Sequence, residues 1–253
     1  MIEVEGLTRR YGGALAVDGA SFRVGPGELL ALVGGSGSGK TTTLKMINRL
    51  VEPDAGRVVL DGRDTASLEP HALRRSIGYV FQGVGLFPHM SVSENVGVSL
   101  RLAGWPRQRI EARVGEMLRL VELDPDLAGR APATLSGGQQ QRIGVARALA
   151  ASPRVLLLDE PFGALDPLTR DRLQGSFDAL RRRLGLTAVF VTHDVAEALV
   201  LADRIGVMRA GRLVQVGTPA ELARSPADEE VARLVDTPRR QARLVTERLE
   251  DRP

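Results

Sequence analysis

The chain has 253 residues, 43% hydrophobic and 4% aromatic, which suits one large α/β domain or two small ones with an aliphatic core. It contains no cysteine, which excludes disulfides, thiolate nucleophiles and cysteine-ligated metals. A net charge of +3, from 34 basic and 31 acidic side chains, gives no reason to expect a nucleic-acid partner. No apolar signal segment opens the chain, and no run approaches the ~20 apolar residues of a membrane span, so we expect a soluble, cytoplasmic protein.

The first third of the chain alternates between strand-like and glycine-rich segments. Residues 2–11 and 20–34 are rich in β-forming residues and predict strands, with a turn at 25–28. The apolar run 29–33 leads into a glycine-rich loop. Residues 40–50 have apolar side chains at helical spacing, and residues 76–82 predict a strand that ends in a polar residue. This order is typical of an α/β core.

The pattern then changes to helical spacing. Residues 85–150, interrupted by Pro and Gly breaks, predict a helical subdomain inserted into the α/β core. The later elements are predicted as buried strands at 154–161 and 187–194, a helix at 169–185 and a hairpin at 203–219. We therefore expect one domain over residues 1–237, followed by a short charged tail over residues 238–253.

The glycine-rich loop fits the phosphate-binding pattern G-x-x-x-x-G-K-[ST], with a strand before it and a helix after it. Glycine lets backbone N–H groups approach phosphate oxygens, and a helix that begins near Gly39 presents its positive end to the same anion. Lys40 is expected to reach the β- and γ-phosphates, and the Thr41 hydroxyl to ligate Mg²⁺. A flexible glycine turn would not explain the strand, the helix and the lysine together. The predicted ATP-binding set is Gly34, Gly35, Ser36, Gly37, Ser38, Gly39, Lys40, Thr41 and Thr42.

Two adjacent acids end the strand predicted at 154–161. Alone, Asp159 and Glu160 would fit an ordinary solvated acid pair, but beside a phosphate loop they predict catalytic chemistry. Asp159 is expected to bind Mg²⁺, and Glu160 to polarise the attacking water.

Polar residues also end two other predicted strands, at Gln82 and His193. Ligands collect at the carboxyl ends of strands in open α/β sheets, so we expect Gln82 near the metal and His193 at the γ-phosphate. A purely structural histidine is the alternative for His193; His71 and His89 lack this placement and receive no role. Tyr11 is expected to stack on adenine, with a packed surface ring as the alternative.

With these residues assembled, the chain resembles the ATPase subunit of ABC transporters over about residues 2–237. The resemblance rests on an ordered set of motifs: Tyr11, the loop at 34–42, Gln82, LSGGQ at 135–139, VLLLDEP at 155–161, ALD at 164–166 and His193. It implies a P-loop NTPase core of the RecA-like α/β type, with an N-terminal antiparallel β subdomain and an inserted α-helical subdomain.

The resemblance also implies a homodimer, because two such domains pair head to tail and hold two ATP molecules between them. Each ATP touches the phosphate loop of one domain and the LSGGQ segment of the other. The residues implied to contact ATP in trans are Ser136, Gly137, Gly138 and Gln139, and those implied near the dimer interface are Leu165 and Asp166. Small residues and a helix that begins near Gln139 suit this role physically, and Lys40 of the other subunit would supply the missing lysine.

Within the family, several segments look like those of importers of quaternary-amine osmoprotectants such as glycine betaine, choline or carnitine; MINRLVEP at 46–53 weighs most. This implies permease subunits that dock on residues 82–95, an extracytoplasmic solute-binding protein, and a place at the cytoplasmic face of the membrane. Alternatives are an importer of another small solute (an amino acid, polyamine or anion), an exporter, a soluble ABC ATPase acting on DNA or ribosomes, and a non-enzymatic binding module. The chain is not expected to touch the solute, so none of its residues selects it.

Overall fold

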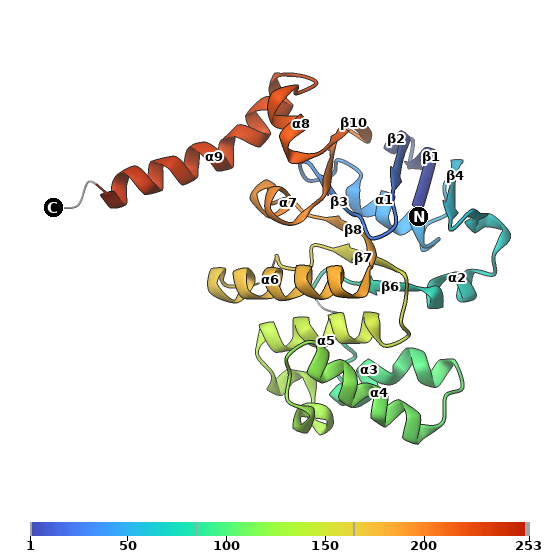
Figure 1. The fold of residues 1–253 in the computed structure, drawn as a ribbon. Helices are drawn as coiled ribbons and strands as arrows, with labels where there is room; N and C mark the ends of the chain where they lie inside the picture. The colour runs from blue at the N-terminus through green and yellow to red at the C-terminus, as the bar shows by residue number, and fades with distance from the viewer. Residues whose placement is uncertain (1, 84, 164, 251–253) are drawn as a thin grey trace.

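The computed structural model describes residues 2–83, 85–163 and 165–250, and Figure 1 shows the arrangement of their helices and strands. In these residues one sheet has six strands in the order β10-β9-β3-β8-β7-β6, and a second has four in the order β2-β1-β4-β5. The first sheet contains β3 (Leu29–Val33), β6 (Ile77–Val80), β7 (Val155–Asp159), β8 (Thr187–Val191), β9 (Arg204–Arg209) and β10 (Arg212–Gly217). The second contains β1 (Ile2–Tyr11), β2 (Ala14–Val24), β4 (Ala55–Leu60) and β5 (Arg63–Asp64).

The larger sheet is parallel except at one edge. β6, β7, β8, β3 and β9 pair in parallel, and β10 returns antiparallel to β9. Every residue of β3, β7 and β8 is buried, which explains why these strands are continuous apolar runs instead of alternating ones. Because parallel strands end at the same edge, the loops after β3, β6, β7 and β8 meet there. The predicted α/β core is confirmed.

The smaller sheet is antiparallel throughout and belongs to the N-terminal part of the chain, as predicted. Its buried residues Val4, Leu7 and Val17 share a hydrophobic cluster with Leu44 of α1 and Leu157 of β7. The cluster joins the two sheets through the helix that follows the glycine loop, so that helix is fixed from both sides.

The helices are α1 (Lys40–Ile47), α2 (Pro70–Ser76), α3 (Val92–Leu102), α4 (Arg107–Leu120), α5 (Gly137–Leu149), α6 (Pro167–Leu184), α7 (Val195–Leu201), α8 (Pro219–Arg224) and α9 (Glu229–Glu250); short 3₁₀ turns occur at Thr65–Ser67, Pro125–Gly129 and Pro132–Thr134. α3, α4 and α5 form a group at the bottom of Figure 1, where Val96, Met117 and Ile143 belong to one buried cluster. α1 lies near the top of the same view, with β7 and α6 between it and α5.

The C-terminal segment is a long helix that projects from the domain (Figure 1). α9 runs across the domain boundary predicted at residue 237 and continues through Pro238. Its first turns are anchored by Val231 and Val235, which are buried, whereas Leu244 and Leu249 near its end are exposed. Residues 251–253 of the predicted tail lie outside the described residues. Among the helices that the structure describes, none is both long enough and apolar enough to cross a bilayer.

Candidate functional site

The glycine loop connects β3 to α1 and depends on glycine at two positions. Gly34 and Gly39 have φ values of 149° and 100°, and a Cβ at either would overlap a carbonyl oxygen, that of Met208 or of Ala16. Gly39 is the N-cap of α1 and provides no side-chain cap, and the first turn carries no acidic residue. The free N–H groups at this helix end therefore favour an anion.

Lys40 directs its ammonium group back onto the loop. Its Nζ donates hydrogen bonds to the carbonyl oxygens of Gly34 and Gly35 at 2.8 and 2.9 Å. Burial lowers the pKa of Lys40, and the carboxylates of Glu160 and Asp159 act in the opposite direction. A partly desolvated positive charge inside a ring of backbone groups is suited to binding a phosphate.

Asp159 lies at the end of β7, buried beside the loop. The Thr41 hydroxyl donates to its Oδ1 at 2.9 Å, and the Tyr79 hydroxyl donates to its Oδ2 at 3.4 Å. Burial, together with Asp159, raises the pKa of Tyr79, so that phenol remains a donor. A hydroxyl and a carboxylate side by side match the oxygen ligands that Mg²⁺ prefers. No group of three or more metal-binding side chains occurs among the described residues, as expected for an ion held largely by phosphate and water.

Glu160 is contacted by the polar residues that follow the two strands flanking β7. Gln82, after β6, donates its Nε2 to Glu160 Oε2 at 3.0 Å, and His193 Nδ1, after β8, lies 3.3 Å from Glu160 Oε1. Glu160 itself has a φ of 48°, unusual for a residue with a side chain, and its N–H donates to Val191 O at 2.9 Å. The strained turn thus aims the carboxylate between the other two side chains. Sequence patterns carry no signal for this backbone conformation.

The LSGGQ segment forms the beginning of α5, away from the glycine loop of the same chain (Figure 1). Ser136 is the N-cap: its Oγ accepts from the N–H of Gln139 at 3.3 Å, and Gln139 Oε1 accepts from the N–H of Ser136 at 3.0 Å. Ser136 and Gln139 form a capping box, so the helix begins at Gly137, two residues before Gln139. A Cβ on Gly138 would press into the Thr169 methyl group of α6, so glycine allows the two helices to approach closely.

Three other predicted residues lie outside the contacts described above: Leu165 and Asp166 after β7, and Tyr11 at the end of β1. Leu165 is buried, and Asp166 caps α6 by accepting from the N–H of Thr169 at 3.0 Å, which lowers the pKa of Asp166. Ala164, the first residue of the predicted ALD motif, lies outside the described residues. Tyr11 ends β1 with a half-exposed ring, 5.0 Å from the guanidinium of Arg9. An exposed ring suits either a stacking platform or a surface side chain, so its adenine contact stays a prediction.

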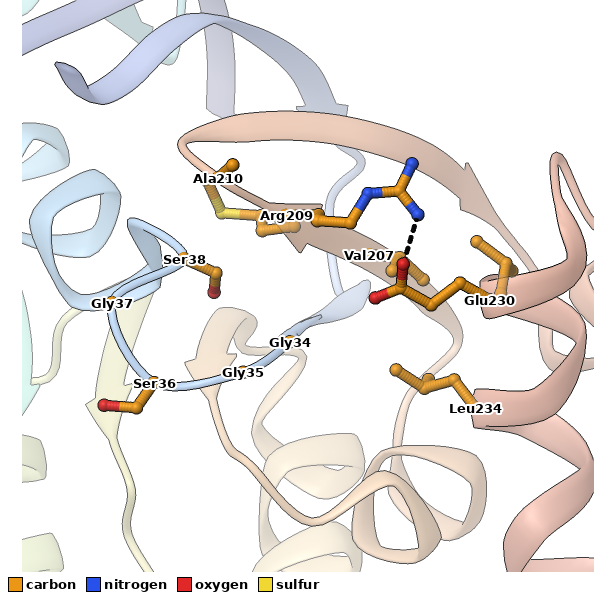
Figure 2. A pocket seen from close by; sticks show the side chains of 12 residues that line it. Gly34, Gly35, Ser36, Gly37, Ser38, Val207, Arg209, Ala210, Glu230 and Leu234 are labelled. Atoms are coloured by element: carbon orange, nitrogen blue, oxygen red, sulfur yellow. Dashed lines mark hydrogen bonds and ion pairs between the residues drawn. The ribbon is translucent and has the colours of Figure 1, made fainter.

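A cavity of about 340 Å³ opens beside the glycine loop, as Figure 2 shows. One wall is the loop 34–38, a second is the end of β9, and the third is α9. Arg209 of β9 is tied to Glu230 of α9 at 2.8 Å and to Asp228 just before it at 2.7 Å. Neither Lys40 nor Asp159 lines this cavity, so it borders the loop from the α9 side. Sequence reasoning did not anticipate this contribution of α9.

Residues 17–163 match the family described as ABC transporter. The chain belongs to the ABC transporter family. It is 51% identical to the choline transport ATP-binding protein OpuBA of Bacillus subtilis over 93% of this chain and 62% of that protein. It is 50% identical to the glycine betaine/carnitine/choline transport ATP-binding protein OpuCA of the same organism, over 99% of this chain and 66% of that protein.

The chain therefore spans slightly less than two thirds of the length of these relatives. Among solved structures it is similar to the dimeric post-hydrolysis state of the ATP-binding cassette MJ0796 bound to ADP and Pi. That likeness has a TM-score of 0.77 at 33% identity and covers 86% of this chain and 98% of the other. The predicted P-loop NTPase fold of an ATP-binding cassette is confirmed.

Proposed function

We propose that this protein is the ATP-hydrolysing subunit of an ABC importer for a small solute, namely a quaternary ammonium osmoprotectant such as glycine betaine, choline or carnitine. The observation that carries the ATPase assignment is the approach of Gln82 and His193 to Glu160, next to the Thr41–Asp159 pair and the phosphate loop. The solute class rests on the relatives, whose names refer to choline, carnitine and glycine betaine transport.

In the proposed reaction, the N–H groups of the loop and the Lys40 ammonium bind the β- and γ-phosphates of ATP. Glu160 accepts a hydrogen bond from the attacking water and aligns it with the γ-phosphate, while Gln82 and His193 keep that carboxylate in place. Mg²⁺ would be held through Thr41, Asp159 and Gln82, where it would neutralise charge on the phosphate oxygens. His193 is largely exposed, so it is also free to face the γ-phosphate.

Two copies are needed in this proposal. The beginning of α5, with Ser136, Gly137, Gly138 and Gln139, would approach the γ-phosphate of an ATP held by the other subunit. In Figure 1, β7 and α6 lie between α5 and α1, and this arrangement supports engagement of α5 in trans. The dimeric form of MJ0796 bound to ADP and Pi gives further support. Leu165 and Asp166 would then lie near the interface.

Transport requires partners outside this chain. We infer that permease subunits dock on residues 82–95, next to the half-exposed rings of Phe81 and Phe87, at the cytoplasmic face of the membrane. A solute-binding protein would act indirectly, through those subunits. The solute itself would be selected by these partners, since this chain has no contact with it.

The ATPase assignment is tested with Glu160→Gln and a matched control, Glu122→Gln. Glu122 is also a glutamate at positive φ, 57°, but it follows α4 in the helical group, where its Oε1 accepts from Ser176 Oγ of α6 at 3.5 Å. With Mg-ATP, the wild type and Glu122→Gln should release phosphate, whereas Glu160→Gln should not and should elute as an ATP-bound dimer in size-exclusion chromatography. Absence of turnover in the wild type, combined with a monomeric Glu160→Gln protein, would refute the ATPase assignment.

The solute is tested separately, by uptake in a strain that lacks the chain. Labelled glycine betaine, choline and carnitine are compared with an amino acid, a polyamine and sulfate. Restored uptake of a quaternary amine supports the proposal. Restored uptake of only another solute would leave the ATPase assignment intact and overturn the solute class.

A further inference from the structure

The loop that carries Gln82 is held at its far end by a buried asparagine. Asn95 of α3 has no exposed surface. Its Nδ2 donates to the carbonyl oxygens of Phe87, Met90 and Ser91 at 3.0 to 3.2 Å, and its Oδ1 accepts from the N–H of Phe87 at 2.8 Å. These four hydrogen bonds attach the end of the loop to α3, but they do not reach the part nearest Gln82.

That nearer part is held by Arg147, in the last turn of α5. The side chain is buried, and its Nη1 donates to the carbonyl oxygen of Gly85 at 2.7 Å. Its guanidinium centre lies 5.9 Å from the ring centroid of Phe81 and 5.7 Å from that of Phe87. Burial lowers the pKa of Arg147. A planar cation between two rings, with a donor aimed at the main chain, has a geometry that lysine cannot reproduce.

The same helix carries the LSGGQ segment at its other end. α5 has 13 residues and is therefore about 20 Å long, so it connects Ser136 to Arg147 as one rigid element. A shift of α5 at one end moves the carbonyl oxygen of Gly85 at the other. Gln82 lies three residues before Gly85, and its hydrogen bond to Glu160 spans only 3.0 Å.

We propose that Arg147 is a positioning residue, which couples the place of α5 to the place of Gln82 and thereby to the carboxylate of Glu160. The inference rests on the proposed ATPase function and extends it. Arg147 joins α5, which carries the LSGGQ segment that would meet the other subunit, to the loop of Gln82, which contacts Glu160. The rings of Phe81 and Phe87 are each partly exposed, so a permease pressing on them acts on the same guanidinium.

The test uses three variants of the full chain: Arg147→Met, Arg147→Lys and the control Arg113→Met. Arg113 of α4 also ties main chain near the end of α5, because it donates to the carbonyl oxygen of Ala150 at 3.0 Å and to Ser152 Oγ at 2.6 Å. Both arginines therefore contribute packing and backbone hydrogen bonds in the helical region. Of these two arginines, only Arg147 has a hydrogen bond to the loop of Gln82 among the described residues.

The first readout is amide hydrogen exchange without nucleotide. Exchange within residues 81–87 should be at least about tenfold faster in Arg147→Met than in the wild type, and unchanged in Arg113→Met. Arg147→Lys keeps the positive charge but lacks the planar guanidinium, so it should restore less than half of the lost protection. Equal exchange in Arg147→Met and Arg113→Met would overturn the proposal, whether or not the protein hydrolyses ATP.

The second readout is a double-mutant cycle in steady-state ATP hydrolysis. Arg147→Met should lower kcat about tenfold with KM for ATP within about twofold, and Gln82→Ala should lower kcat at least as much. If Arg147 acts through Gln82, the double variant loses no more than Gln82→Ala alone. If the fold-losses in kcat of the two single variants multiply in the double variant, the coupling is refuted. A wild type without turnover would instead refute the ATPase proposal and leave hydrogen exchange to decide the role of Arg147.

Discussion

The structural role of Ser136 as a helix cap can be tested separately from its proposed contact with ATP, because Thr218 forms a similar cap elsewhere. Ser136→Ala removes the N-cap of α5, and Thr218→Ala removes the N-cap of α8. Both caps belong to capping boxes with nearly the same geometry: Ser136 Oγ accepts at 3.3 Å and Thr218 Oγ1 at 3.2 Å, each from the N–H three residues later. The control therefore loses the same helix-capping interaction at a residue to which no ATP contact is assigned.

The expected magnitudes follow from these contacts. Loss of either cap lowers the free energy of unfolding by about 1 kcal/mol, which corresponds to a fall in Tm of about 2–4 °C for a domain of this size. Ser136→Ala also removes a second, proposed interaction, the hydroxyl hydrogen bond to a charged phosphate oxygen across the dimer. A hydrogen bond to a charged group contributes about 1.5–3 kcal/mol, so ATP hydrolysis should fall roughly 10- to 150-fold.

The assay pairs thermal unfolding with phosphate release at saturating Mg-ATP. Similar Tm shifts in both variants, with hydrolysis lost only in Ser136→Ala, would support a phosphate contact made by the Ser136 hydroxyl. If the two variants lose Tm alike and both keep full hydrolysis, Ser136 is a helix cap and nothing more. If they lose hydrolysis alike, general destabilisation explains the effect and the trans contact has no support.

Three further predictions concern the loop, a buried acid and the aromatic ring. Gly39→Ala should abolish binding of a fluorescent ATP analogue and lower Tm, because the new Cβ meets the Ala16 carbonyl oxygen at a φ of 100°. Burial raises the pKa of Glu197 above its usual 4.5, so its stabilising contribution is complete below pH 4.5 and is lost as pH rises through the folded-state pKa. Glu197→Gln should therefore unfold at higher urea than the wild type at pH 8, with the gap closing toward pH 4.5. Tyr11→Ala should weaken ATP binding in a fluorescence titration, with Tm unchanged since the ring is half exposed.

Most of the fold was accessible from local patterns. Continuous apolar runs predicted the parallel strands, because β7 and β8 are buried on both faces and need no polar side. The loop motif predicted a strand before Gly34 and a helix at Lys40. Since parallel strands share one carboxyl edge, it followed that Gln82 and His193 would come near Asp159. The shared edge of parallel strands therefore predicted a proximity that no single residue indicates.

Backbone conformation and helix extent were less accessible. The sequence does not show that Glu160 adopts a φ of 48°, because residues with a side chain rarely occupy that region and the surrounding contacts impose it. Pro238 favours a helix end, yet α9 continues through it, anchored by Val231 and Val235. The capping box at Ser136 was in principle readable from its S-x-x-Q spacing.

That capping box bears on what the LSGGQ segment presents to a phosphate. Gln139 Oε1 accepts from the N–H of Ser136, and Ser136 Oγ accepts from the N–H of Gln139. In the part of the chain that the structure describes, the donors at the start of α5 that can face a phosphate include the N–H groups of Gly137 and Gly138 and the hydroxyl proton of Ser136. These donors carry no full positive charge, whereas Lys40 carries one but would contact the phosphate only from the side of its own loop. In the proposed dimer, the start of α5 and the glycine loop with Lys40 therefore supply different kinds of phosphate contact. In the proposed dimer, closure of two subunits, and not nucleotide binding alone, would complete the site, and Arg147 would connect that closure to Glu160 through Gly85 and Gln82.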